Sequence, residues 1–110
     1  MDECIFCKII KKEIPAEIIF EDDDFLVFKD IKPKAKVHLL IVPKKHIESI
    51  NHLENGDNDL ISKMFFLVKK IASENGVSDG YKLLFNVGRK GGQLVDHLHL
   101  HLMGGGVEND

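Results

Sequence analysis

The sequence predicts a single α+β domain spanning residues 1–110, in which one long helix covers one face of a five-stranded antiparallel sheet and a short helix precedes it. Three observations predict this class. Apolar residues recur at helical spacing in one long segment, and five short segments have the composition or the alternation that is typical of strands. The strands are also joined mostly by short turns, which favour antiparallel pairing.

The N-terminal part predicts a short helix followed by three strands. Residues 4–12 (CIFCKIIKK) are typical of a short helix that ends before Pro15. Two short segments separated by three aspartates predict a hairpin, Glu17–Glu21 and Phe25–Lys29. The apolar stretch Val37–Pro43 predicts a buried third strand that Pro43 ends.

The clearest helix signal lies between Asp57 and Asn75. Asp57 or Asn58 can cap its start, and Gly76 is suited to end it. The apolar positions that follow helical spacing are Leu60, Ile61, Met64, Phe65, Leu67, Val68, Ile71 and Ala72. This stripe predicts a helix that packs on the sheet.

Two further strands are predicted after the long helix. Tyr81–Val87 follows a DG turn signal, and His97–Met103 alternates strictly between two residue types. A flexible loop, Gly88–Gln93, separates them, and the glycines of Gly104–Gly106 are expected to end the last strand. Its leucines should face the long helix, so its histidines should face the opposite side.

Composition and charge exclude several classes of partner. The net charge of −3 provides no cationic field for a nucleic-acid backbone, although a local pocket can still hold a small nucleotide. No apolar run approaches the roughly 20 residues that cross a bilayer, and the N-terminus lacks a secretory apolar region. We therefore expect an intracellular protein, located in the cytoplasm with the nucleus as a second location, whose cysteines are reduced.

The stretch DHLHLHLMGGG gathers half of the six histidines of the chain. On a strand His97, His99 and His101 would share one face, with Cα atoms roughly 7 Å apart. Neutral imidazole is a nucleophile and a metal ligand, and its protonated form donates to anions. The glycines of the preceding GGQ leave backbone N–H groups accessible to an anion. The residues alone leave catalysis, metal binding and a solvated face as alternatives.

The two cysteines, Cys4 and Cys7, have C-x-x-C spacing. A thioredoxin-type redox pair would follow a strand in a βαβ unit, and no such strand is predicted here. A structural zinc site needs about four ligands. Further candidate ligands are the three clustered histidines and His38, His46 and His52. Spacing alone supports zinc and two incidental thiols equally.

Together these stretches resemble the histidine triad (HIT) nucleotide-binding superfamily. HLHLHLM matches the His-φ-His-φ-His-φ-φ signature, where φ is apolar, and the resemblance is best to the HINT branch. The supporting stretches are IFCKIIKKEIPAEIIFEDDDFLVFKDI, HLLIVPKKHI and GGQLVDHLHLHLMGG, so the resemblance runs from about Cys4 to Gly105. It implies a HIT-like fold.

The resemblance implies a hydrolase of purine nucleoside phosphoramidates or acyl-linked nucleotides that works through a covalent nucleotidyl-histidine. His99 matches the nucleophile, His101 the histidine that contacts the phosphate, and His97 the first member of the triad. His38 matches a histidine that supports the triad from the neighbouring strand. The alternatives are a dinucleoside polyphosphate hydrolase and a non-catalytic purine nucleotide-binding adaptor; metal storage is a further, weaker alternative.

The resemblance also implies a set of nucleotide contacts. Asp30 would bind the ribose hydroxyls, although an aspartate after a strand also commonly caps a loop. The base would lie in an apolar slot formed by Phe6, Phe28, Ile31 and Leu40, which are equally consistent with core packing. The phosphate and leaving group would meet Asn86, Gly92, Gln93 and the backbone at Val95.

A structural zinc ion and a homodimer are implied as well. The zinc ligands would be Cys4, Cys7, His46 and His97, which leaves His52 without a task. The sequence departs from HINT-like enzymes at Leu94, where they usually have a serine that helps to protonate the leaving group, and at Asp96, where an aromatic residue is common. A C-terminal segment as short as GGGVEND would also contribute little to a partner's pocket.

Overall fold

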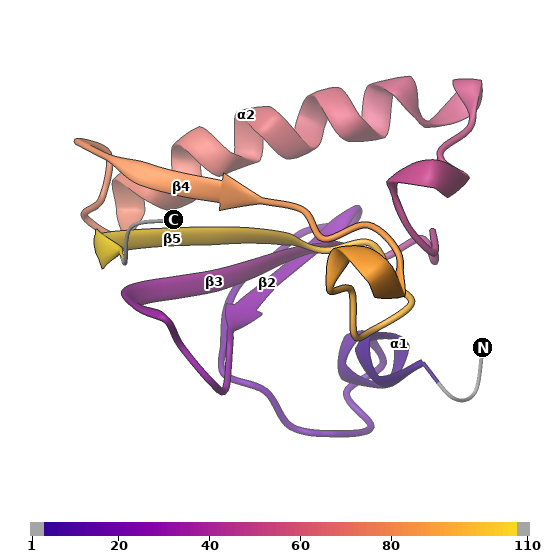
Figure 1. The fold of residues 1–110 in the computed structure, drawn as a ribbon, viewed down its shortest axis with the longest axis horizontal. Helices are drawn as coiled ribbons and strands as arrows, with labels where there is room; N and C mark the ends of the chain where they lie inside the picture. Colours follow the sequence, from indigo (N-terminus) through magenta and orange to yellow (C-terminus); the bar gives the residue numbers. More distant parts are fainter. Residues whose placement is uncertain (1–3, 108–110) are drawn as a thin grey trace.

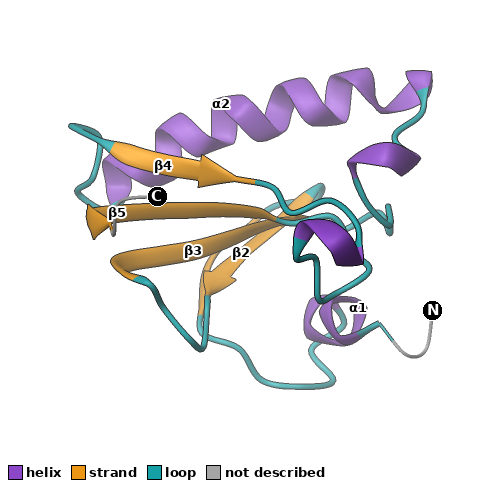
Figure 2. Cartoon of the chain, viewed as in Figure 1, coloured by secondary structure: helices purple, strands orange, loops and turns teal. Residues whose placement is uncertain are grey.

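The computed structural model describes residues 4–107 and contains one antiparallel sheet of five strands. The strand order is β1-β2-β3-β5-β4, so that the last strand lies between the third and the fourth (Figure 2). The strands are β1 (Ile18–Glu21), β2 (Phe25–Lys29), β3 (Ala35–Pro43), β4 (Tyr81–Leu84) and β5 (Leu100–Val107). The predicted α+β class and sheet are thereby confirmed.

The helices lie on opposite sides of the sheet. Helix α2 (Asn58–Glu74) runs along one face, and the short helix α1 (Ile5–Ile10) lies near the opposite face (Figure 1). The larger core, between α2 and the sheet, contains the three leucines that alternate with the histidines, together with residues of α2. A smaller apolar cluster joins α1 to β2 and β3. The predicted orientation of the leucines toward α2 is therefore confirmed.

The long helix starts in a different way from the prediction. Asp57 occupies its N-cap position but makes no side-chain cap there. Its carboxylate instead accepts from the backbone N–H of Glu54 at 2.9 Å and from Lys45 Nζ at 2.6 Å. Asp57 thereby closes the preceding 3₁₀ turn η2 (Asn55–Asp57), in a reciprocal capping box with Glu54. The helix ends as predicted, with Gly76 in the left-handed region at φ 74°.

The predicted bounds of the last two strands need correction. β5 begins at Leu100, so His97 and His99 precede the strand, and it continues through the glycines to Val107. The glycines do not end it because main-chain pairing needs no side chain: Gly104 pairs with Val37 on one side and Tyr81 on the other. β4 is shorter than predicted and ends at Leu84.

No helix within residues 4–107 is long and apolar enough to span a membrane. The remaining short elements are the 3₁₀ turns η1 (Ile50–His52) and η3 (Arg89–Gly91). η3 belongs to the loop between β4 and β5, and Arg89 of η3 lines a surface pocket together with Ile5 of α1. This loop leads directly into the histidine stretch.

Gly104→Ala should destabilise the protein, because a Cβ at this position would lie 2.7 Å from Val77 Cβ. Overpacking of this kind costs about 1–3 kcal/mol of unfolding free energy, which urea denaturation can measure. Gly80→Ala is the matched control, since a Cβ there would meet nothing within 4 Å. Equal stability of the two variants would contradict the close packing of β5 against Val77.

Candidate functional site

The first histidine of the triad faces the two cysteines. His97 is fully buried, and its Nε2–H donates to the carbonyl oxygen of Pro43 at 2.7 Å. A carbonyl oxygen only accepts, so the ring proton is on Nε2 and Nδ1 keeps its lone pair. That lone pair points at Cys4 Sγ, 3.3 Å away, and Cys7 Sγ, 3.5 Å away. Burial lowers the pKa of His97 to about 4, which favours the neutral ring.

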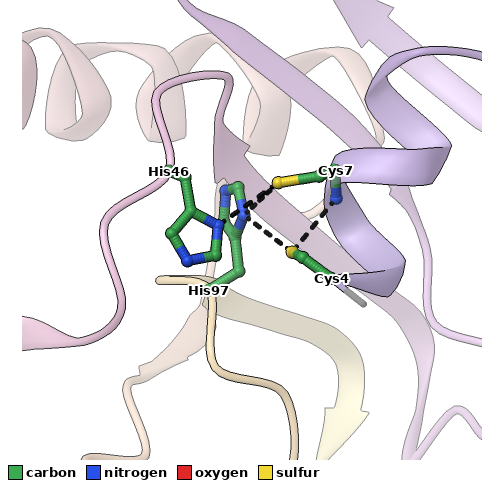
Figure 3. A group of neighbouring side chains, drawn as sticks. All are labelled: Cys4, Cys7, His46 and His97. Carbon is green, nitrogen blue, oxygen red and sulfur yellow. Dashed lines mark hydrogen bonds between the residues drawn. The ribbon is translucent and has the colours of Figure 1, made fainter. Parts of the chain in front are cut away.

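Four side chains from three segments of the chain converge at this point (Figure 3). Their sulfur and nitrogen atoms all lie within 4.8 Å of one another, and Cys7 Sγ is 3.2 Å from His46 Nδ1. Zinc bonds of about 2.3 Å to sulfur and about 2.0 Å to nitrogen put adjacent ligand atoms of a tetrahedron roughly 3.5 Å apart. The geometry and chemistry of Cys4, Cys7, His46 and His97 therefore match a closed tetrahedral zinc site.

Each of these four side chains is placed by local structure. Cys4 is the N-cap of α1 and accepts the backbone N–H of Cys7 at 3.2 Å, which puts both sulfurs at one end of the helix. His46 follows β3, and His97 precedes β5. Burial raises the pKa of the Cys7 thiol to about 11, with Cys4 adding to the effect. A cation at the centre would offset this cost, because thiolates are the metal-binding form.

The central histidine has its reactive nitrogen free. The Nδ1–H of His99 donates to the carbonyl oxygen of His97 at 2.8 Å, so Nε2 is unprotonated. Nε2 has no hydrogen-bond partner among the described residues, yet the described chain has no buried side-chain nitrogen without a partner. Nε2 must therefore reach solvent although the residue as a whole is only 8% exposed. Burial lowers the pKa of this ring below its ordinary value.

The third histidine ends a chain of hydrogen bonds. The backbone N–H of Lys34 donates to His38 Nδ1 at 3.0 Å, so the His38 proton is on Nε2 and is donated to His101 Nδ1 at 2.9 Å. His101 consequently carries its own proton on Nε2, which is directed away from this chain of bonds. Asp30 Oδ2 lies 3.4 Å from His38 Nε2 and 3.9 Å from His101 Nδ1. The chain of bonds makes His101 a donor to any anion bound beside it.

The same hydrogen bonds argue against a second metal site. Asp30, His38 and His101 also place their ligand atoms within 4.8 Å of one another. A metal on His38 Nε2 would have to move the ring proton to Nδ1, where it would oppose the N–H of Lys34. We therefore interpret these three residues as a relay of hydrogen bonds that fixes the proton positions on the two rings, in contrast to His97, whose Nδ1 lone pair faces the two cysteines.

The free Nε2 of His99 and the protonated Nε2 of His101 belong to neighbouring rings. The centroids of His99 and His101 lie 5.1 Å apart at an interplanar angle of 60°. One ring offers a lone pair and the other an N–H donor. A phosphate between them could be attacked at phosphorus by His99 while an oxygen is held by His101.

The residues of the predicted base slot meet only in part. Phe6, Phe28 and Leu40 share the smaller apolar cluster, with Val95 packed against it, and the two aromatic rings are 5.5 Å apart in an edge-on arrangement. Ile31 lies apart from this cluster and is 91% exposed. Asp30 begins the loop that carries Ile31, and its Oδ1 accepts the backbone N–H of Lys32 at 2.8 Å.

Two of the side chains predicted to contact phosphate, Gln93 and Asn86, form hydrogen bonds with the main chain of the protein instead. The Gln93 amide accepts from the N–H of Gly88 and donates to the carbonyl oxygens of Glu48 and Val95. Asn86 Nδ2 donates to the carbonyl oxygen of Gly91 at 2.9 Å. The glycine beside it, Gly92, adopts the left-handed region at φ 88°. Their contacts with phosphate stay predictions, and their visible role is to shape the loop that leads into the triad.

Sequence reasoning missed the main-chain partners of the rings. The carbonyl of Pro43 and the N–H of Lys34 carry no side-chain signal. It also missed Arg89, whose guanidinium donates to both carboxylate oxygens of Asp96, at 2.8 and 3.1 Å. His52 lies outside the site and pairs with Glu48 at 3.0 Å on the surface.

Comparisons with known proteins place the chain in a family. Residues 3–109 match the family described as "Scavenger mRNA decapping enzyme C-term binding". The protein HitA of Neisseria gonorrhoeae is 50% identical over 104 residues, which cover 94% of this chain and 97% of HitA.

Solved structures show the same relationship. A HIT family hydrolase from Legionella pneumophila is 49% identical, with a TM-score of 0.94 over 97% of this chain and 96% of that chain. A HIT family hydrolase from Clostridium thermocellum is 39% identical, with a TM-score of 0.95 over 100% of this chain and 96% of that chain. The chain therefore belongs to the HIT family, and these similarities support a nucleotide-binding protein of the hydrolase type.

The pH titration of His101 tests the relay. Burial, reinforced by the neighbouring His99 and His38, lowers its pKa from 6.5 to about 4. The ring should therefore stay neutral at pH 7 and titrate near pH 4 in proton NMR spectra. Because the unfolded chain takes up this proton first, His101 should lower the stability of the fold as the pH falls from about 6.5 to about 4. A titration midpoint at or above 6.5 would contradict a buried, neutral His101 that accepts the hydrogen bond from His38.

Proposed function

We propose that this protein hydrolyses purine nucleoside phosphoramidates or acyl nucleotides and releases the nucleoside monophosphate. The observation that carries the proposal is the pairing of an unprotonated, solvent-reaching Nε2 on His99 with a protonated Nε2 on His101. A nucleophile beside a hydrogen-bond donor to the phosphate is the arrangement that phosphoryl transfer through a covalent intermediate requires.

In the first step, the Nε2 lone pair of His99 attacks the α-phosphorus. A bond forms between Nε2 and phosphorus while the bond from phosphorus to the leaving nitrogen or acyl oxygen breaks, and the leaving group takes that electron pair. An acyl oxygen departs as a carboxylate, whereas a leaving nitrogen takes up a proton from solvent and departs as the neutral amine. The ring gains positive charge, which the hydrogen bond from Nδ1 to the His97 carbonyl stabilises. The His101 N–H holds a phosphate oxygen, on which negative charge accumulates.

In the second step, water attacks phosphorus and the electron pair of the Nε2–phosphorus bond returns to His99. The proton of the attacking water passes to solvent, and the nucleoside monophosphate leaves. Asp30 would accept hydrogen bonds from the ribose hydroxyls, and Phe6, Phe28 and Leu40 would contact the base. These contacts follow from the position of Asp30 beside the relay and from the shared apolar cluster.

Leu94 favours one alternative substrate class. Its side chain is 82% exposed and has no donor, so it cannot protonate a departing amine. A phosphate or nucleotide leaving group departs as an anion and needs no proton. Dinucleoside polyphosphates are therefore the second candidate, and comparison of kcat/KM between the two substrate classes separates them. An adaptor that binds nucleotide without turnover would be inactive on both.

We further propose that Cys4, Cys7, His46 and His97 hold a structural zinc ion. Zinc bound there would supply a cross-link between α1, the segment after β3 and the segment before β5, with all four positions taken by protein ligands. Its chemistry would be structural, since no position remains for a reacting water.

The protein should contain about one zinc ion per chain when purified without added metal. Elemental analysis measures this, and Cys7→Ser should lose most of the zinc because one of four ligands no longer forms a thiolate. His52→Ala is the matched control, since His52 is a surface histidine outside the cluster. A cluster that stays empty in equimolar zinc would contradict the proposal.

We also propose a homodimer. β4 is an edge strand of the sheet, and aromatic and leucine side chains are exposed on α2 and β4. They are Phe65 and Phe66, at 46% and 70% exposure, and Leu83 and Leu84, at 37% each. An open strand edge and exposed apolar side chains favour pairing with a second copy. Sedimentation at the mass of a monomer would refute the homodimer.

The cytoplasmic location stays a prediction.

His99→Ala should reduce kcat on an adenosine phosphoramidate by more than about 10³-fold, because the attacking nitrogen is removed. Turnover assays and circular dichroism would show loss of activity with the fold retained. His52→Ala should keep full activity. Substantial turnover by His99→Ala would rule out the covalent route.

A further inference from the structure

Phe6 connects the four-residue cluster of cysteines and histidines to the nucleophile. It lies between Cys4 and Cys7 in the first turns of α1, and it is 7% exposed. Its ring meets His99 edge-on, with centroids 5.0 Å apart at 87°, and it also meets His97 at 6.1 Å. Any shift of the two cysteines must therefore move a ring that contacts the nucleophile.

The second connection between the cluster and His99 runs through the main chain of His97. Its imidazole is held by the Pro43 carbonyl on one side and by the two sulfurs on the other. Its own carbonyl accepts the Nδ1–H of His99 at 2.8 Å. The ring and the carbonyl belong to one residue, so an anchored ring restricts where that carbonyl can point.

We infer that the cluster of Cys4, Cys7, His46 and His97 sets the aim of the nucleophile, through two positioning contacts on His99, the Phe6 ring and the His97 carbonyl. The inference rests on the proposed function, in which His99 Nε2 attacks phosphorus and zinc occupies the cluster. It goes further because it gives the cluster an effect on the reaction, carried by these two contacts.

The physical basis is the position of one proton. A neutral imidazole has its proton on either nitrogen, and the hydrogen bonds around it decide which one. The His97 carbonyl places the proton on Nδ1, which leaves the attacking lone pair on Nε2. If the carbonyl turns away, the proton can reside on Nε2, and a ring in that state has no lone pair facing the substrate. The edge contact with Phe6 opposes the ring rotation that would have the same result.

The cluster can be reached from solvent without unfolding. A surface pocket of about 320 Å³ is lined by two of the four ligands, Cys4 and His46. Ile5, Glu48 and Leu94 are among its other walls. We expect metal and a chelator to reach the cluster of the folded protein through this opening.

The test follows the ring nitrogens of His99 directly. Protein labelled with ¹⁵N in histidine would be studied without nucleotide by long-range ¹H–¹⁵N NMR, with zinc, after chelation, and after zinc is restored. We expect the Nδ1–H form of His99 with zinc, a mixture of both forms after chelation, and full recovery. Unchanged His99 signals, in a sample where the His46 and His97 signals do change, would overturn the inference.

Two variants separate the contacts. Cys7→Ser should reproduce the chelated spectrum and lower kcat roughly 10- to 100-fold, as expected for a misplaced nucleophile, while the Kd for AMP changes less than about 3-fold. Phe6→Leu should keep its zinc and still show a mixture of the two His99 forms. Ile5→Ala is the matched control, because Ile5 is on the same helix but is 47% exposed. If Ile5→Ala and Phe6→Leu behave alike, Phe6 has no positioning role.

The design distinguishes this inference from the proposed function. If wild-type protein turns over no nucleotide, the hydrolase proposal fails, and the NMR comparison still decides whether the cluster positions His99. If Cys7→Ser does not fold by circular dichroism, the chelated wild-type protein provides the same comparison. If chelation changes kcat but leaves the His99 signals alone, the cluster acts by another route and the inference is wrong.

Discussion

The hydrogen bond from His99 Nδ1 to the carbonyl oxygen of His97 determines which nitrogen of the central ring can react. It joins residues only two apart, so it depends on the exact path of the chain before β5. That path is fixed at both ends, by the ring of His97 among the cysteines and by the leucines in the core. The chemistry proposed for the site follows from this one bond, because it leaves a lone pair on Nε2.

Three identical side chains in one short stretch acquire different states because their partners differ. The carbonyl of Pro43 accepts from Nε2 of His97, and the carbonyl of His97 accepts from Nδ1 of His99. The backbone N–H of Lys34 donates to His38, which in turn donates to Nδ1 of His101. As a result, His97 turns a lone pair toward the cysteines, His99 has a lone pair free to attack, and His101 has an N–H to donate. Burial lowers the pKa of His97, His99 and His101, which favours the neutral form of each ring.

Much of the fold was predictable because periodicity reports directly on burial. The α2 stripe and the alternation of Leu98, Leu100 and Leu102 with histidines gave the layers correctly. The start of β5 was not predictable, since alternation also occurs in an extended segment that pairs elsewhere: Leu98 N–H donates to the Ile47 carbonyl and not to a neighbouring strand. The extension through Gly104 was missed because glycine favours turns in sequence but pairs here through its main chain.

The site was predictable in its side chains and unpredictable in its main-chain partners. The sequence alone named Cys4, Cys7, His46 and His97, and also the three relay residues Asp30, His38 and His101. The structure brings each set together. The exposure of Ile31 and the hydrogen bonds of the Gln93 amide could not be predicted from the sequence, because both depend on how the loops fold. Proton positions followed only when the partners of each ring nitrogen were known.

The most direct test of the central claim is to identify the atom that bonds to phosphorus. Protein labelled with ¹⁵N in histidine would be mixed with an adenosine phosphoramidate, quenched in base during turnover and studied by ³¹P NMR. The account predicts a phosphorus signal with one-bond coupling to ¹⁵N, assigned to Nε2 of His99. Coupling to Nδ1, coupling to another histidine, or turnover without any phosphorus–nitrogen adduct would contradict it.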